Sequence, residues 1–209
     1  MLSSLRPKSA RARSATTDSE VTCEEVVDVG AATMMKSSLQ KDVKGNLCRI
    51  AEASDSLESQ STDTFWILET LEATHGLGQE LAAHLPASSL LLLEGPLGAG
   101  KTSLVQGLAM ALNIEEPITS PTFSLAQHYP DGQPPLIHLD LYRLEQPMAA
   151  NELFLQEEEE AQALGALMAV EWPERLSLEL PDAWRLQLQH LPMGGRRAQL
   201  KTPLQSANG

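Results

Sequence analysis

A short glycine-rich segment in the middle of the chain has the clearest chemical signature. Residues 95–102 read GPLGAGKT and match the eight-position pattern G-x-x-x-x-G-K-[ST]. In such a loop, backbone N–H groups curl around a polyphosphate, the lysine binds the β- and γ-phosphates, and the hydroxyl after it suits Mg²⁺. The segment predicts binding of a nucleotide with its magnesium ion, and the residues expected to contact it are Gly95, Leu97, Gly98, Ala99, Gly100, Lys101, Thr102 and Ser103.

The elements on either side of this loop fit that prediction. A continuous apolar run at residues 90–93 precedes it and is typical of a buried parallel strand. Leu104, Leu108 and Leu112 follow at four-residue spacing, which predicts a helix that begins at Lys101. The N-terminal dipole of that helix points at the same anions. An incidental glycine turn is the weaker alternative.

A phosphate loop alone binds a nucleotide, and a reaction also needs an acid for Mg²⁺ or water. Two carboxylates are well placed: Asp140 in a predicted strand at 135–143, and Glu171 directly after the apolar strand 166–170. In an open α/β sheet the ligand binds beyond the carboxyl ends of the strands. Glu171 meets this rule, and Asp140 meets it if its strand is parallel to the loop strand. A surface carboxylate is the alternative for either.

The remaining periodicities predict an α/β domain. Strands are expected at 64–68, 184–191 and 198–201, and helices after Thr70 and at 151–165. The strand 184–191 alternates apolar and polar residues, which indicates a half-exposed antiparallel strand paired with 198–201. We expect a three-layer sandwich of the P-loop NTPase type, with a central mixed, mainly parallel sheet and an antiparallel C-terminal hairpin. The acidic run 157–160 is expected to be a solvated helix face.

The composition divides the chain near residue 64. All eight aromatic residues lie from Phe65 onward, whereas 1–64 holds both cysteines and is rich in serine, threonine and charge. Such a segment buries too little apolar surface to offset its ordering entropy. We expect 1–64 to be largely disordered with a weak helix near 47–53, a P-loop domain over 65–202, and a frayed tail over 203–209.

Charge and hydropathy exclude several classes of partner. The chain has 209 residues and a formal net charge of −13, and its residues 65–209 combine seven basic with 18 acidic groups. An acidic domain is poorly suited to binding RNA phosphates by its overall charge. No apolar run reaches the roughly 18–20 residues that span a bilayer, so no membrane contact is expected.

The first 14 residues contain four basic residues, several serines and no acid. This composition resembles an organelle transit peptide, although the segment lacks a clear amphipathic apolar face. A solvated basic tail, or an extension from a mis-assigned start codon, is the favoured alternative. No secretory apolar region follows, so we expect a cytoplasmic protein, with an organelle stroma or matrix as the alternative.

Four segments in order resemble the TsaE (formerly YjeE) family: the phosphate loop and residues 118–123 (ITSPTF), 138–144 (HLDLYRL) and 170–175 (VEWPER). The resemblance covers about residues 66–197. That family comprises small P-loop ATPases needed for the N6-threonylcarbamoyladenosine (t6A) modification of adenosine 37 in tRNA. The resemblance therefore implies that this protein is a Mg²⁺-dependent ATPase. It would bind ATP, act with the partners TsaB and TsaD, and reach tRNA only through them.

The resemblance also implies roles for single residues. Lys101, Asp140 and Glu171 would be the catalytic set, with Asp140 either polarising water or ordering Mg²⁺. Thr102 and Glu171 would hold the metal, and Thr74 would lie beside the nucleotide.

Other positions carry weaker expectations. By the same resemblance, residues 119–123 match a switch-like loop and Trp172 matches the tryptophan beside the second acid. Pro96, where the family often has an acid, departs from the pattern without touching the catalytic positions. From the residues alone, His138 is expected to pack or to form a local hydrogen bond, and the aromatic side chains expected in the core are Phe123, Phe154 and Trp184.

Three other functions compete with this interpretation. A GTPase needs an N-K-x-D type element that reads guanine, and the sequence has none. A nucleotide kinase usually needs several arginines to hold two phosphorylated substrates, and this domain is poor in them. A third alternative, a non-catalytic module that binds ATP only as a structural ligand, stays open.

Overall fold

The computed structural model describes residues 38–41, 47–51 and 64–203. Nine strands lie within them: β1 Ser38–Lys41, β2 Leu47–Ala51, β3 Thr64–Leu68, β4 Leu90–Glu94, β5 Ala126–Tyr129, β6 Leu136–Asp140, β7 Leu167–Glu171, β8 Trp184–His190 and β9 Arg196–Lys201. The same residues form four helical elements: α1 Leu71–His84, α2 Lys101–Ala111, α3 Pro147–Leu164 and the short 3-10 helix η1 Pro173–Arg175.

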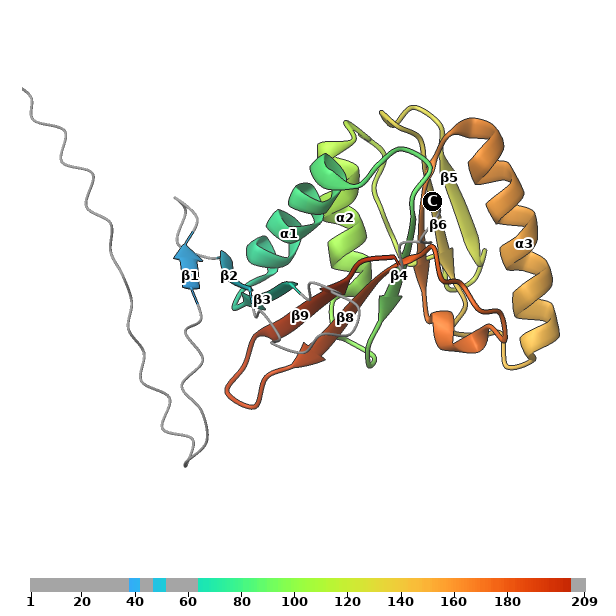
Figure 1. Ribbon diagram of the computed structural model, residues 1–209. Helices are drawn as coiled ribbons and strands as arrows, with labels where there is room; N and C mark the ends of the chain where they lie inside the picture. The colour runs from blue at the N-terminus through green and yellow to red at the C-terminus, as the bar shows by residue number, and fades with distance from the viewer. Residues whose placement is uncertain (1–37, 42–46, 52–63, 204–209) are drawn as a thin grey trace, which may run out of the picture. The chain divides into compact units, whose positions relative to one another are not determined.

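All nine strands form one sheet in the order β1-β2-β3-β9-β8-β4-β7-β6-β5. The four central strands, from β8 to β6, are parallel, and every pairing outside them is antiparallel. The α/β class with a mixed sheet is thus confirmed, with its parallel part at the centre and its antiparallel parts at both flanks (Figure 1). β8 forms the expected hairpin with β9, but it also pairs in parallel with β4.

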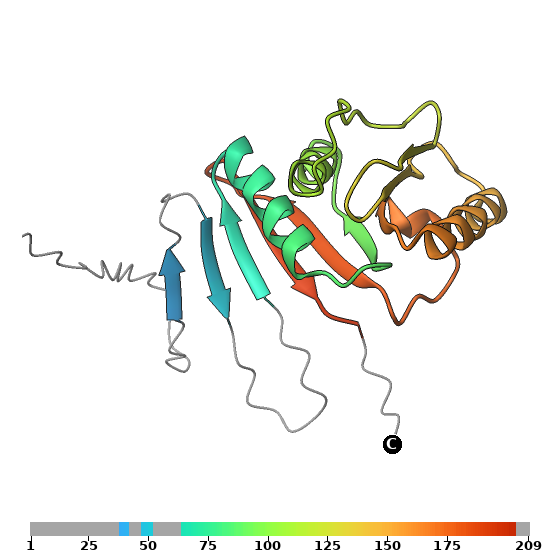
Figure 2. The same cartoon turned by 90° about the horizontal axis from the view of Figure 1, so that it is seen from above.

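Helices cover both faces of the sheet. α1 and α2 lie side by side on one face, and α3 lies on the other (Figure 2). The side chains of β4 alternate accordingly: Leu91 and Leu93 belong to the core under α1 and α2, whereas Leu92 belongs to the core under α3. A strand buried on both faces needs a continuous apolar run, and this explains the four consecutive leucines that precede the phosphate loop.

α1 and α2 pack at backbone distance through two glycines. A Cβ atom at Gly78 would lie 2.3 Å from the carbonyl oxygen of Leu104, and one at Gly107 would lie 2.2 Å from that of His75. Neither position can carry a side chain without movement of the helices. The contact fixes α2, which begins at the phosphate loop, against α1, whose first turn is capped by Thr70 as predicted.

We expect Gly107→Ala to lower the free energy of unfolding by about 1–3 kcal/mol, because the added methyl group forces the two helices apart. Alanine is otherwise favoured over glycine inside a helix by about 1 kcal/mol. Gly76→Ala, where the added Cβ meets nothing within 4 Å, should therefore stabilise the chain. Urea unfolding measures both variants, and midpoints that move in the same direction would contradict the close contact.

Several expectations from the sequence need correction. Residues 47–51 form β2, which pairs with β3, so the helix expected near 47–53 is wrong. β1 and β2 are strands within the segment expected to be largely disordered. α3 begins four residues before its predicted start, and β5 has no counterpart among the predicted strands.

Glu157 differs from the solvated position expected for it. Its side chain is buried, and its Oε2 lies 2.6 Å from Nε2 of His128 on β5. The acidic run therefore turns one of its four carboxylates toward the sheet, where the imidazole supplies its polar partner.

The remaining sequence expectations for residues 1–37, 42–46, 52–63 and 204–209, including the basic N-terminal segment, lie outside the described residues. Within the part of the chain that is described, no helix is long and apolar enough to cross a membrane.

Candidate active site at the phosphate loop

The phosphate loop leaves the carboxyl end of β4 and ends where α2 begins. Its three glycines, Gly95, Gly98 and Gly100, have φ angles of 138°, 77° and 100°, which side-chain-bearing residues rarely adopt. Gly95 is required for a second reason, since a Cβ atom there would lie 2.3 Å from the carbonyl oxygen of Leu188 on β8. The loop conformation thus depends on the glycines that the motif contains.

Lys101 folds back over the loop that it follows. Its Nζ donates hydrogen bonds to the carbonyl oxygens of Gly95 (2.7 Å) and Pro96 (3.1 Å) and lies 3.8 Å from the centre of the Trp172 ring. Burial lowers the pKa of Lys101, while the nearby carboxylates, Glu171 foremost, act in the opposite direction. A desolvated ammonium group held by neutral partners is suited to exchange them for phosphate oxygens.

Trp172 is held in an unusual backbone conformation beside Lys101. Its φ of 60° lies in the left-handed region, directly after β7 and before η1. The ring also packs against Tyr142, with ring centroids 4.8 Å apart. The indole ring therefore links the phosphate-loop lysine to the residues that follow β6.

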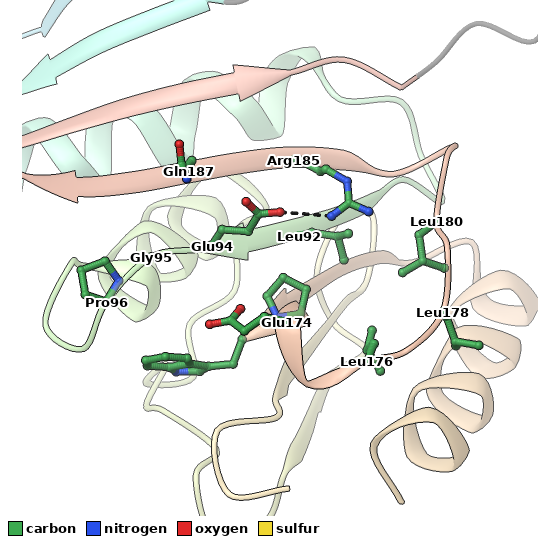
Figure 3. Close-up of a pocket in the computed structure, with 12 residues that line it drawn as sticks. Leu92, Glu94, Gly95, Pro96, Glu174, Leu176, Leu178, Leu180, Arg185 and Gln187 are labelled. Carbon is green, nitrogen blue, oxygen red and sulfur yellow. Dashed lines mark hydrogen bonds and ion pairs between the residues drawn. The ribbon is translucent and has the colours of Figure 1, made fainter. Parts of the chain in front are cut away.

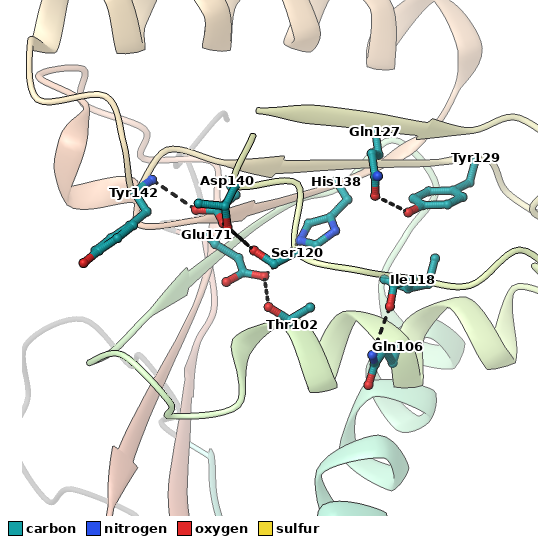
Figure 4. Close-up of polar contacts among 11 residues, drawn as sticks. Thr102, Gln106, Ile118, Ser120, Gln127, Tyr129, His138, Asp140, Tyr142 and Glu171 are labelled. Atoms are coloured by element: carbon teal, nitrogen blue, oxygen red, sulfur yellow. Dashed lines mark hydrogen bonds and ion pairs between the residues drawn. The ribbon is translucent and has the colours of Figure 1, made fainter. Parts of the chain in front are cut away.

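Thr102, Glu171 and His138 form a continuous hydrogen-bonded chain (Figure 4). The hydroxyl of Thr102 donates to Oε1 of Glu171 at 2.8 Å, and Nε2 of His138 lies 2.9 Å from the same oxygen. Both Glu171 and His138 are buried. The parallel pairing of β6 with β7 places Asp140 directly opposite Glu171, so the condition set for Asp140 is met.

These groups have the donor set that Mg²⁺ prefers. Thr102 and Glu171 supply hard oxygen ligands, and the threonine proton is committed to the carboxylate, which leaves the hydroxyl lone pairs for a cation. No cluster of three or more histidine, cysteine or acidic side chains suited to a metal occurs among the described residues. Two protein oxygens with water and substrate phosphate are a usual coordination for Mg²⁺, so the residues fit this ion.

Asp140 holds the switch-like loop. Its Oδ2 accepts hydrogen bonds from the hydroxyls of Ser120 (2.7 Å) and Thr122 (2.9 Å), and its Oδ1 accepts one from the backbone N–H of Tyr142 (3.0 Å). Gln106 of α2 fixes the start of the loop by donating to the carbonyl oxygen of Ile118. The loop at 118–123 is therefore tied both to the acid at the end of β6 and to the helix after the phosphate loop.

Phe123 is not in the core, contrary to the expectation. It is 86% exposed, and the guanidinium of Arg143 lies 4.2 Å from its ring centre. Of the other two aromatic residues expected there, Phe154 is fully buried and Trp184 is partly buried against the core.

Two further residues lie beside Gly100 of the phosphate loop, one of them expected from the sequence and the other not. Thr74 is buried, donates its hydroxyl to the carbonyl oxygen of Thr70, and has its methyl group 3.6 Å from a Cβ atom built on Gly100. Arg196 could not be predicted from its neighbours in the sequence, and its Nε lies 3.0 Å from the same point. That Nε is buried and has no hydrogen-bond partner among the described residues.

A pocket of about 550 Å³ adjoins the phosphate loop (Figure 3). The loop residues Gly95 and Pro96 form one end of it. Arg185 and Glu94 lie in its wall as an ion pair at 3.1 Å. Its other lining residues are Leu92, Trp172, Pro173, Glu174, Leu176, Leu178, Leu180 and Gln187.

The structure brings most of the predicted site residues together. Lys101 and Thr102 from α2, Asp140 from β6 and Glu171 from β7 meet at the carboxyl ends of the parallel strands, as the rule for open sheets requires. Of the remaining loop residues, Leu97 is 71% exposed, so any nucleotide contact is expected from its backbone rather than its side chain.

Comparisons with known proteins agree with this arrangement. A family model described as threonylcarbamoyl adenosine biosynthesis protein TsaE matches residues 68–198. A tRNA threonylcarbamoyladenosine biosynthesis protein TsaE from Nostoc sp. is 45% identical over 130 residues, which are 62% of this chain and 80% of that protein. One from Synechocystis sp. is 48% identical over 119 residues, covering 56% and 74%.

A solved structure gives the same result for the fold. The crystal structure of YdiB from Bacillus subtilis superimposes with a TM-score of 0.56 and 25% sequence identity, covering 70% of this chain and 89% of that one. The likeness supports the P-loop NTPase type of fold. With the family match over more than half of the residues, it follows that the chain belongs to the TsaE family.

Proposed function

We propose that the chain binds ATP with Mg²⁺ and hydrolyses it as a subunit of the t6A modification machinery of tRNA, together with TsaB and TsaD. The observation that carries the proposal is the meeting of Lys101 with the Thr102–Glu171 pair at the end of one phosphate loop. The role in t6A biosynthesis comes from the family, whose members carry it in their names.

The residues would share the work as follows. Gly95 to Ser103 would hold the phosphates through backbone N–H groups, and Lys101 would leave its two carbonyl partners to bind them. Thr102 and Glu171 would hold Mg²⁺, which neutralises charge on the phosphate oxygens when bound. Thr74 would lie beside the nucleotide.

Asp140 is the residue best placed to couple hydrolysis to movement. Its Oδ2 already accepts two hydrogen bonds from the switch-like loop, so movement of that loop would free this oxygen to accept a proton from water. We propose that Asp140 holds this loop in place and that release of Ser120 and Thr122 accompanies the reaction.

The partners are proposed from the family and from charge. Residues 65–209 hold only seven basic groups against 18 acidic ones, so direct binding of tRNA by this domain is disfavoured. We propose that it contacts a basic surface of TsaB or TsaD in the cytoplasm, or in an organelle if the N-terminal segment is a transit peptide.

Phosphate release from ATP should be slow for the isolated chain and should rise on addition of TsaB and TsaD. Steady-state phosphate release, measured with and without each partner, tests this expectation. Tight ATP binding without turnover in either condition would instead support the alternative of ATP as a structural ligand.

A further inference from the structure

His138 is a buried histidine whose ring contacts Glu171, the carboxylate proposed above to hold the metal. Its side chain is fully buried in β6, and Nε2 lies 2.9 Å from Oε1 of Glu171 (Figure 4). Within the described part of the chain, its Nδ1 has no hydrogen-bond partner.

The contact fixes which nitrogen carries the proton. A neutral ring protonated on Nδ1 would bury an unpaired N–H group and direct the Nε2 lone pair at a carboxylate oxygen, and both features are unfavourable. The ring must therefore carry a proton on Nε2, which donates to Glu171.

Glu171 is thus held from two sides. Oε1 receives one hydrogen bond from Thr102 on α2 and a second from His138 on β6, whereas no hydrogen bond to Oε2 is found among the described residues. Two donors on one oxygen fix the rotation of the carboxylate and leave the other oxygen available. Outer partners of this kind orient metal-site ligands and typically contribute about 10–100-fold in metal affinity.

We propose that His138 is a positioning residue that holds Glu171, and through it Thr102, in the arrangement that binds the Mg²⁺ of the bound nucleotide. This inference rests on the proposed function of the same site. The inference gives His138 a role beyond packing, namely donation of a hydrogen bond to Oε1 of Glu171. An apolar residue of similar volume would fill the same space but could not donate this bond.

The test measures how nucleotide binding depends on Mg²⁺ in the full chain. A fluorescent ADP analogue with an N-methylanthraniloyl ribose is titrated with and without Mg²⁺, for the unchanged chain and for His138→Leu, His138→Gln and His138→Asn. The Leu variant removes the donor, Gln retains an amide donor near the position of Nε2, and Asn has a donor too short to reach. His84→Leu, on the exposed end of α1, is the matched control.

His138→Leu and His138→Asn should need at least about tenfold more Mg²⁺ for half-maximal effect, with unchanged Mg²⁺-free affinity. His138→Gln and His84→Leu should remain close to the unchanged chain. If the Leu variant fails to fold, the contrast between Gln and Asn decides. The inference would be overturned if the Leu variant responds to Mg²⁺ like the original chain, or if the Asn and Gln variants respond alike. If the original chain itself shows no Mg²⁺ response, the proposed function is refuted instead.

Discussion

Lys101→Ala is expected to lower partner-stimulated ATP turnover by at least about a hundredfold, the typical cost of removing one charged or hydrogen-bonding group from a transition state. In the structure the residue is only 4% exposed, and its ammonium group is held at the loop by two carbonyl oxygens and the face of Trp172. Among the described residues, Lys101 is the one lysine or arginine that donates a hydrogen bond to those carbonyl oxygens. The phosphates would therefore lose their principal cation.

The matched control is Lys201→Ala, which removes an exposed lysine at the end of β9 and should leave turnover unchanged. Steady-state phosphate release with TsaB and TsaD present measures both variants, and a urea unfolding curve shows that each is folded. Normal turnover in folded Lys101→Ala would mean that the lysine only closes the loop through Gly95 and Pro96.

The phosphate loop and the elements beside it could be predicted from the sequence because every signal there is local. The glycines, the apolar run before them and the leucine spacing after them each lie within a few residues, and β4 and α2 occur where expected. The ends of β6 and β7 were also accessible, since acids at the carboxyl ends of parallel strands are found by a general rule. This is why Asp140 and Glu171 could be named.

Contacts that depend on register could not be predicted. His138 reaches Glu171 because β6 and β7 pair in parallel, and Arg196 reaches the loop because β9 folds back beside β8. Neither contact can be recognised from the types of the neighbouring residues in the sequence. Residue type also misleads where a loop is exposed: Phe123 has the side chain of a core residue, yet it lies in the segment that Asp140 holds through Ser120 and Thr122.

Glu171→Gln is expected to reduce turnover by about 10²–10³-fold at a fixed Mg²⁺ concentration, with partial recovery when Mg²⁺ is raised. The amide has the shape of the carboxylate, and its oxygen can still accept the hydrogen bonds of Thr102 and His138. The negative charge is lost, and an amide NH2 group replaces Oε2, the oxygen that the carboxylate leaves available for the metal. Phosphate release across a Mg²⁺ titration measures the effect, and Glu179→Gln, an exposed acid eight residues along, is the control.

Comparison of Glu171→Ala with Glu171→Gln separates the role of the charge from the role of the hydrogen-bond acceptor at this position. The Ala substitution should also abolish turnover, and in addition it leaves a buried imidazole N–H without its acceptor, which costs about 1–3 kcal/mol of stability. We therefore expect the Ala variant to unfold at a lower urea concentration than the Gln variant, although both lose activity. Equal stability of the two variants would contradict this expectation and show that the acceptor at position 171 contributes little to the stability of the fold. Full turnover in the Gln variant at low Mg²⁺ would place the metal on other groups.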